Sequence, residues 1–271
     1  MSKTKTNLPQ ITDLISLRGK SAIITGAASG IGKATAHRFA EAGADLHLVD
    51  IDSANLEVTK KELSAYGTHV QTHIVNLASK KEIDNFWAKL KPDLPDILVN
   101  NAGFYPFRDF VDVDETYYRK VMDTNLDSVY WMCQHMIRER MKKKQGGVIV
   151  NMGSIEAILP FKDDLGHYSM SKAGVIALTR ALAKEHARHG FRVNAILPGG
   201  IMTNGTRNAA KQILHFKFDL IKTGIEFAQR LPVKRAGKPD EVARIALVLA
   251  SDLASYIHGA LIPVDGGFLA A

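Results

Sequence analysis

The sequence predicts an α/β fold built on a seven-stranded parallel sheet that is doubly wound, with helices on both faces. Short, mostly apolar segments alternate with helical patterns along nearly the whole chain, as in sheets whose strands are connected by helices. The first apolar segment runs into a glycine-rich turn that opens a helix. Polar residues cluster where the apolar segments end, which is where open parallel sheets bind ligands.

The expected strands and helices alternate in order along the chain. Strands covered on both faces carry few polar residues, and segments of this kind lie at 21–24, 45–50, 70–75, 96–99, 148–152, 192–197 and 260–264. The expected helices lie at 33–43, 54–66, 80–90, 115–143, 167–189 and 239–250. No internal repeat interrupts this order.

The composition is that of an ordinary globular enzyme. The 271 residues are 46% hydrophobic and 23% charged, and the net charge is +7. Basic residues are scattered except in the run 138–144, which ends a helical pattern, where cations complement the helix dipole. We interpret that run as a solvated helix end and expect no nucleic-acid partner. The single cysteine, Cys133, excludes an internal disulfide, and its apolar neighbours predict a buried thiol in a reducing compartment.

The first residues of the chain differ from the rest. Residues 1–17 are polar, lack the apolar segment of a signal peptide, and are expected to form a loosely held N-terminal extension. Residues 18–271 are expected to form a single domain. No stretch reaches the roughly 18 apolar residues that span a bilayer, so we expect a cytoplasmic protein without membrane contact.

The glycine-rich turn has the spacing G-x-x-x-G-x-G, formed by Gly26, Gly30 and Gly32. Backbone N–H groups in such a turn, together with the helix N-terminus, can hold a phosphate. Asp50 ends the next expected strand, 18 residues beyond Gly32, near the distance at which an acid accepts hydrogen bonds from an adenosine ribose. A plain strand–turn–helix connection and a strand-end turn acid are the alternatives. Together the two features favour a Rossmann-like dinucleotide site.

Further candidates lie at the ends of later strands. Asn100-Asn101-Ala102-Gly103 ends the fourth strand and Ser154 follows the fifth. Tyr168 and Lys172 are four residues apart at the start of a helix, so they share one helical face. Taken singly, each has a structural explanation: a turn, or a phenol beside a solvated ammonium.

In combination these motifs resemble the short-chain dehydrogenase/reductase family. The resemblance adds Asn125, the segment Pro198-Gly199-Gly200-Ile201-Met202-Thr203 and the closing Val264-Asp265-Gly266-Gly267, and extends from about Leu17 to Phe268. It implies that residues 18–271 are a dinucleotide-binding catalytic domain. It also implies a homotetramer; the small residues of 173–177 would allow close helix packing, and Trp131 and Met132 could line the contact.

The resemblance implies a role for each catalytic candidate. Tyr168 would be the general acid/base, Ser154 would hold the substrate oxygen, and Asn125 would position a water for proton relay. An ammonium about 4 Å away favours a phenolate by about 4 kcal/mol at an effective dielectric near 20. We therefore expect Lys172, together with the cationic oxidised nicotinamide, to lower the pKa of Tyr168. Lys172 would also bind the nicotinamide ribose.

The implied cofactor is NAD, not NADP. A carboxylate such as Asp50 repels a 2′-phosphate, and Ser29 and Ile51 occupy positions where NADP-preferring relatives carry Arg or Lys. Asn76 replaces an Asp of many relatives, so the adenine contact should be weaker. The expected cofactor contacts are Gly26, Ser29, Gly30, Ile31, Gly32, Asp50, Asn76, Leu77, Asn101, Ala102, Gly103, Tyr168, Lys172, Pro198, Gly199, Ile201 and Thr203, with Asn100 beside them. We expect no metal.

The substrate is the least constrained part of the prediction. Glu156 and His167 are candidates to hydrogen-bond a hydroxylated substrate such as a sugar or polyol, or else to bond the backbone or water. A substrate lid is expected at 203–232, and the loop 161–166 is one residue longer than the commonest spacing. We expect an NAD(H)-dependent oxidoreductase acting on a small secondary alcohol or ketone. The alternatives are a 3-oxoacyl-thioester reductase of fatty-acid synthesis and a non-catalytic dinucleotide-binding scaffold.

Overall fold

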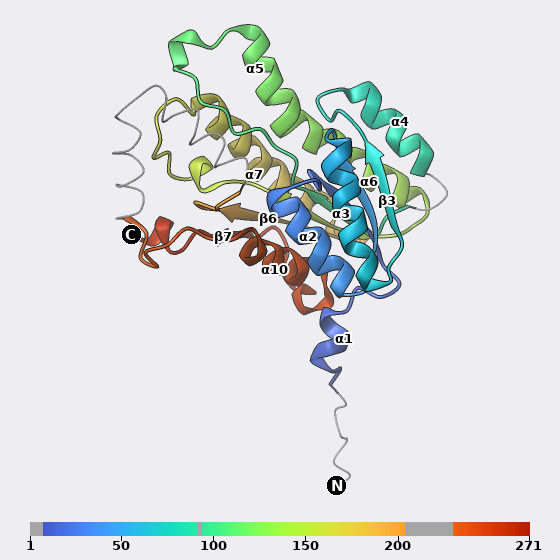
Figure 1. The fold of residues 1–271 in the computed structure, drawn as a ribbon. Coiled ribbons are helices and arrows are strands. Elements are labelled where there is room, and N and C mark those ends of the chain that lie inside the picture. The colour runs from blue at the N-terminus through green and yellow to red at the C-terminus, as the bar shows by residue number, and fades with distance from the viewer. Residues whose placement is uncertain (1–7, 91–93, 204–229) are drawn as a thin grey trace.

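The structure, a computed structural model, describes residues 8–90, 94–203 and 230–271 and contains the predicted sheet. Seven parallel strands lie in the order β3-β2-β1-β4-β5-β6-β7, so the chain winds outward from β1 in one direction and then from β4 in the other (Figure 1). Their bounds are β1 Ser21–Thr25, β2 Asp45–Asp50, β3 Val70–Ile74, β4 Ile97–Asn100, β5 Gly147–Met152, β6 Phe191–Pro198 and β7 Leu261–Val264. The fold class is confirmed.

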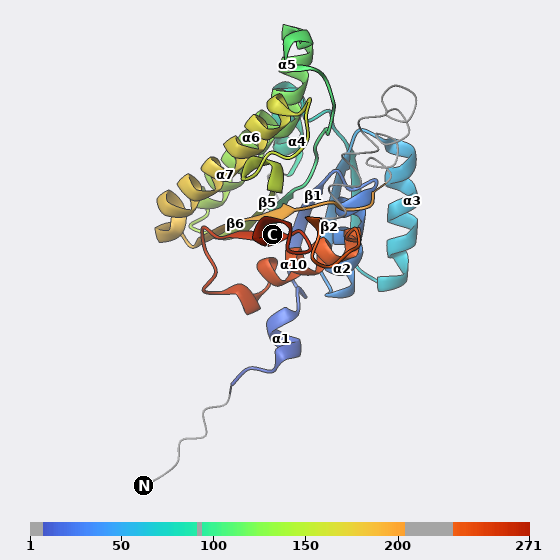
Figure 2. The same cartoon turned by 90° about the vertical axis from the view of Figure 1, so that its left-hand side faces the viewer.

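Helices cover both faces of the sheet (Figure 2). One face packs against α2 (Gly30–Glu41), α3 (Ser53–Leu63) and α10 (Pro239–Ala250). The other packs against α4 (Lys80–Leu90), α6 (Ser128–Lys142) and α7 (Gly166–His186), with α5 (Glu115–Met122) continuing into α6. β1 and β4 lie side by side, but the connection after β1 leads to one side of the sheet and the connection after β4 leads to the other. The crevice between these two connections is where ligands of such sheets bind.

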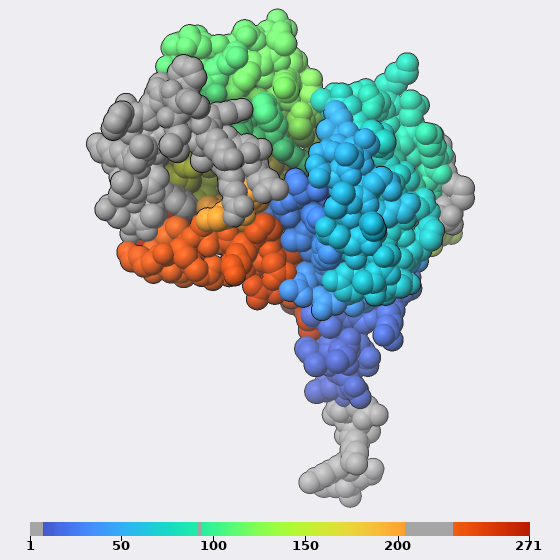
Figure 3. Space-filling view, in the orientation of Figure 1, coloured from blue at the N-terminus to red at the C-terminus, as the bar shows by residue number. Residues whose placement is uncertain are grey.

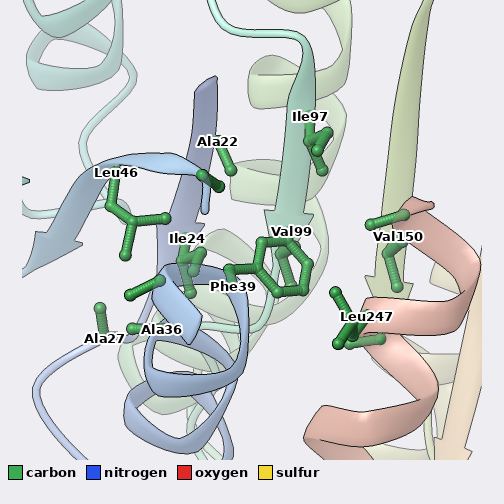
Figure 4. Close-up of a cluster of buried hydrophobic side chains, with 14 of the residues drawn as sticks. Ala22, Ile24, Ala27, Ala36, Phe39, Leu46, Ile97, Val99, Val150 and Leu247 are labelled. Atoms are coloured by element: carbon green, nitrogen blue, oxygen red, sulfur yellow. The ribbon is translucent and has the colours of Figure 1, made fainter. Parts of the chain in front are cut away.

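The hydrophobic core lies in two layers, one on each side of the sheet. Figure 4 shows the layer beneath α2 and α10, where Phe39 and Leu247 face the strand residues Ile24, Val99 and Val150. Burying a side chain of this size stabilises the fold by about 1.5–3 kcal/mol. The site residues at the strand ends therefore rest on a rigid support.

The long helix predicted at 115–143 is interrupted. A π-helical segment, Asp123–Asp127, separates α5 from α6. It carries Asn125, which is fully buried and bonds the backbone of Phe104: the amide oxygen accepts from the amide N–H (2.7 Å) and Nδ2 donates to the carbonyl (2.8 Å). A π segment adds one residue to a turn and occurs often at functional sites.

Two residues predicted to be near the surface are buried instead. Arg140, in the basic run, is 7% exposed; it donates to the Pro95 carbonyl and pairs with Asp96 at 3.1 Å, so this part of the run is not a solvated helix end. Met132 is fully buried, and its sulfur accepts a hydrogen bond from Trp87 at 3.2 Å, so it cannot line a contact between subunits. Neither exception follows from the charge or helical pattern.

The N-terminal segment is partly attached to the domain. The short helix α1, Ile11–Ile15, buries no residue and projects from the body of the molecule (Figures 1 and 3). Leu17, in contrast, is 1% exposed, belongs to the core, and donates its N–H to the Ala42 carbonyl. No helix among the described residues is long and apolar enough to cross a membrane.

Candidate active site

The glycine-rich turn is a closely packed junction between β1, α2 and the end of β4. Gly26 and Gly30 have φ angles of +67° and +55°, which favour glycine. A Cβ on Gly32 would lie 2.1 Å from the Gly26 carbonyl oxygen. Asn101 Nδ2 donates to the carbonyl of Thr25 at 2.9 Å and thereby ties the turn to β4. The turn leaves its backbone close to the crevice, as pyrophosphate binding requires.

Replacing Gly32 by Ala is expected to loosen this turn. The new methyl would collide with backbone, and overpacking of this kind costs about 1–3 kcal/mol. We expect a lower midpoint of thermal unfolding and weaker NADH binding, followed by NADH fluorescence. Gly166→Ala is the control, because its Cβ would meet only the Phe110 ring, at 3.7 Å. Unchanged NADH affinity in Gly32→Ala would contradict phosphate binding at this turn.

Asp50 lies at the end of β2 against the glycine-rich turn. Its Oδ2 accepts the N–H of Ala28 at 2.9 Å, and its Oδ1 accepts the N–H of Ile51 at 2.7 Å. The carboxylate is thus fixed next to the turn, where the ribose of a dinucleotide would lie. At the end of β3, the Asn76 amide oxygen accepts the N–H of Ala78, and Leu77 is buried.

One pocket at the carboxyl ends of β4, β5 and β6 brings together many of the predicted residues. Ser154, Tyr168 and Lys172 all line it. Thr203 lies beside the glycine-rich turn, since a Cβ on Gly30 would be 3.3 Å from its methyl carbon. Other predicted cofactor contacts on the pocket wall are Ile31, Asn101, Gly103, Pro198, Gly199 and Ile201.

Other predicted residues lie outside this pocket. Asn100 has its side chain in the core, where Nδ2 donates to Asn151 at 2.8 Å, so this side chain does not line the pocket. Asn125 holds the loop after β4 through its hydrogen bonds to Phe104. The loop residue Gly103 lies close to both Asn125 and Lys172, since a Cβ on Gly103 would be 3.4 Å from Asn125 Oδ1 and 3.5 Å from Lys172 Nζ. The greater part of the predicted lid, 204–229, lies outside the described residues.

Ser154 and Tyr168 form the polar centre of the pocket. Ser154 follows β5, is 6% exposed, and its Oγ accepts the N–H of Glu156 at 3.2 Å. Burial raises the pKa of Tyr168 to about 12, although a hydrogen bond with Ser154 acts in the opposite direction. A hydroxyl and a phenol placed together in this way can bind one oxygen of a carbonyl or alcohol.

Lys172 by itself does not bring the pKa of Tyr168 below its ordinary value. Lys172 Nζ lies 5.9 Å from the centre of the Tyr168 ring and donates to the Met152 carbonyl at 2.9 Å. Burial also lowers the pKa of Lys172 to about 8, so the amine loses its proton more readily than an exposed lysine does. Burial therefore sets the direction of both pKa shifts.

The structure separates the two predicted substrate residues. Glu156 is 2% exposed and lines the pocket; its Oε2 accepts the N–H of Phe161 at 3.3 Å, and its Oε1 is buried without a hydrogen-bond partner. Burial raises the pKa of Glu156 to about 7. His167 does not line the pocket, and its Nε2 lies 3.3 Å from the Pro106 carbonyl oxygen. The contact that the structure shows for the His167 ring is thus with the backbone, and its Nδ1 is buried without a hydrogen-bond partner.

Two further residues line the pocket: Tyr105, which the sequence offers either as an apolar wall of the site or as core packing, and Lys162, which the sequence does not single out. Tyr105 packs its ring edge-to-face on Tyr168, with the centroids 4.8 Å apart. Lys162 lines the same pocket from the loop after β5. The extra residue in loop 161–166 was the available signal, but it gave no indication of which side chain enters the pocket. Across the described parts of the chain, no group of three or more His, Cys, Asp or Glu residues could hold a metal ion.

Comparison with known proteins gives consistent matches over nearly the whole chain. A family model described as enoyl-(acyl carrier protein) reductase matches residues 26–269. A 3-oxoacyl-(acyl-carrier-protein) reductase from Thermotoga maritima is 38% identical, covering 93% of this chain and 99% of its own. Galactitol 2-dehydrogenase (L-tagatose-forming) from Cereibacter sphaeroides is 36% identical over 93% and 96% of the two chains.

Solved structures of similar proteins have the same fold as this chain. A protein from Agrobacterium tumefaciens assigned as a 2-deoxy-D-gluconate 3-dehydrogenase, crystallised with NADP, superposes with a TM-score of 0.86. The two sequences are 31% identical, and the match covers 96% of this chain and 100% of the other.

Proposed function

Because the chain belongs to the short-chain dehydrogenase/reductase family of nicotinamide-dependent oxidoreductases, we propose that it interconverts a secondary alcohol and a ketone with NAD(H). The observation that carries this proposal is the shared wall of Ser154, Tyr168 and Lys172 beside the glycine-rich turn. When bound, the nicotinamide would supply or accept the hydride. The turn and Asp50 suit such a cofactor: backbone packs closely around Gly32 in the turn, and the Asp50 carboxylate is fixed beside it by the N–H of Ala28.

The chain's own residues would handle the proton and the substrate oxygen. Tyr168 would donate its phenolic proton to the oxygen of a ketone, or take the proton from an alcohol. Ser154 Oγ would hold the same oxygen. Lys172 would contact the nicotinamide ribose, and Asn125 would keep the adjacent loop in position through Phe104 while serving the proton relay.

The choice of NAD over NADP rests on Asp50. Its carboxylate is fixed by the N–H groups of Ala28 and Ile51, so it cannot easily turn away from a 2′-phosphate. The similar protein from Agrobacterium binds NADP. This chain instead has the uncharged residues Ser29 and Ile51 at the positions where a cation would bind the 2′-phosphate of NADP.

We infer that the substrate is hydroxylated, as a sugar or polyol is. The buried Oε1 of Glu156 supports this, because a buried carboxylate oxygen without a partner is costly until a donor reaches it. The similarity to a galactitol dehydrogenase also supports a hydroxylated substrate.

Replacing Glu156 by Ala tests this inference. We expect kcat/KM for polyols to fall by about tenfold, the worth of one hydrogen bond to a charged group, while that for simple apolar secondary alcohols changes little. NADH absorbance would follow both reactions. His167→Ala is the matched comparison, since that ring bonds the protein backbone. If both alcohol classes respond equally to Glu156→Ala, the residue has no substrate role.

A 3-oxoacyl-thioester reductase is the second candidate, and the Thermotoga relative favours it. Such reductases usually use NADPH, which Asp50 opposes. A screen of polyols and a 3-oxoacyl thioester with both cofactors separates the two. A non-catalytic scaffold is less well supported, because Ser154, Tyr168, Lys172 and Asn125 are all present.

We also propose a cytoplasmic homotetramer. The single cysteine, Cys133, is buried and suits a reducing compartment. On α7, Met170 is 46% exposed and the small residues Ala173 and Ala177 follow on the same exposed face, which would allow a second helix to approach closely.

A further inference from the structure

The ammonium group of Lys162 is held among three aromatic rings. Its Nζ lies 5.7 Å from the centre of Tyr105, 5.8 Å from Phe107 and 5.5 Å from Phe161. Such contacts are favourable for a cation, and they become more so when water is partly excluded. They limit where the ammonium can move. A lysine held in this way presents its charge at a defined place in the pocket.

That place is close to the reacting centre. The Tyr105 ring contacts both Lys162 and Tyr168, with separations of 5.7 and 4.8 Å. Lys162 Nζ therefore lies no farther from the Tyr168 ring centre than the sum of these two separations. Since both side chains line the same pocket as Ser154, one small molecule can reach the phenol and the ammonium together.

Glu156 supports the same arrangement. Its Oε2 accepts the N–H of Phe161, and the carboxyl also interacts with the backbone of Lys162, so Glu156 anchors the loop that carries the ammonium. Its Oε1 remains for another donor. Burial raises the pKa of Glu156 to about 7, so the carboxyl bears only part of its charge at neutral pH. Burial also lowers the pKa of Lys162, and the attraction to Glu156 opposes that shift.

We propose that the substrate is a hydroxy acid or keto acid, that Lys162 binds its carboxylate, and that Glu156 Oε1 accepts one of its hydroxyl groups. This rests on the proposed function and narrows the class of hydroxylated substrate to an anionic one. Hydrogen bonds between two charged groups are about twice as strong as neutral ones. Partial burial of the ammonium strengthens the contact further, because the effective dielectric is lower than in water.

The test compares binding of D-gluconate and D-glucitol to the enzyme saturated with NADH. The two share one six-carbon skeleton and differ in a carboxylate against a hydroxymethyl group, and neither alcohol reacts with reduced cofactor. Lactate and 1,2-propanediol make a shorter pair. By calorimetry we expect at least one acid to bind about tenfold or more tightly than its neutral partner, as one charged hydrogen bond allows. The preference should decrease with salt.

Three variants assign the preference to Lys162. Lys162→Met should remove it, and Lys162→Arg should retain most of it because the charge remains. Lys120→Met is the matched control: Lys120 also lies over an aromatic ring, that of Phe104 at 4.8 Å, but does not line the pocket. Equal binding of acid and neutral partner at both chain lengths, or a preference that survives Lys162→Met, would overturn the proposal.

The same samples separate this proposal from the proposed function. Turnover with oxidised cofactor reports the proposed function, and binding in the presence of NADH reports the carboxylate site. If polyols are oxidised without any preference for acids, only the carboxylate site is wrong. If acids bind preferentially but no alcohol or ketone is turned over, the site remains and the oxidoreductase activity is wrong.

Discussion

Tyr168→Phe is expected to reduce kcat by about 10²–10⁴-fold, the usual contribution of a general acid/base, while NADH still binds. The change removes one oxygen and keeps the ring that packs against Tyr105. Steady-state assays with the best alcohol or ketone from the substrate screen give kcat, and NADH fluorescence gives the binding constant.

Tyr117→Phe provides the control for this substitution. Tyr117 packs its ring against His167 and does not line the pocket, so its hydroxyl has no place in the reaction. We expect wild-type kcat in that variant. Retained turnover in Tyr168→Phe would mean that another group transfers the proton, and lost NADH binding would mean that the hydroxyl supports the cofactor site.

The pH dependence of the wild-type reaction gives a second measure of Tyr168. Ketone reduction needs the phenol, the form that a pKa near 12 maintains across the neutral range. Alcohol oxidation needs the phenolate, whose fraction rises with pH. Oxidation should therefore accelerate with pH. The rate of ketone reduction should not increase with pH, because reduction uses the protonated phenol.

The cofactor preference is the second large effect. We expect kcat/KM to be about 100-fold higher with NADH than with NADPH, because placing a phosphate against a carboxylate costs several kcal/mol. Asp50→Asn removes the charge and keeps one acceptor oxygen, so it can retain the hydrogen bond from Ile51 N–H but replaces the oxygen that accepts from Ala28 N–H by an amide NH2. In that variant we expect the ratio of kcat/KM with NADH to kcat/KM with NADPH to fall about tenfold or more, because the repulsion between carboxylate and phosphate is lost.

Asp45→Asn controls for a general effect on β2. Asp45 begins the same strand and its Oδ1 accepts the N–H of His69 at 2.9 Å, at the edge of the sheet opposite the site. Its replacement should leave the ratio unchanged. A higher kcat/KM with NADPH in the wild type would show that Asp50 does not read a bare ribose.

Much of the fold was predictable because strand and helix patterns repeat locally. The bounds of β2, α4 and α10 agree with the expected ranges, and the other strands differ by one or two residues at their ends. The break at Asp123–Asp127 was not predictable. Apolar residues continue with helical spacing on both sides of it, and one added residue is a small change in that pattern.

The site was predictable as a set of residues but not as an environment. Tyr168 and Lys172 share a helical face by their spacing, whereas the adjacent His167 is rotated away and meets Pro106. The sequence identifies Lys172 as a charge and Tyr168 as a phenol but does not reveal the burial of either group, which raises the pKa of Tyr168 and lowers that of Lys172. Lys162 meets the Tyr105 ring only through tertiary structure.

The π segment before α6 has a consequence for how this enzyme can evolve. Val121 and Val129 on either side are buried, and Asn125 between them is buried too but directed to the loop of Phe104. The additional residue allows both requirements to be met within one continuous helix. Function at this point depends on chain length as well as residue identity.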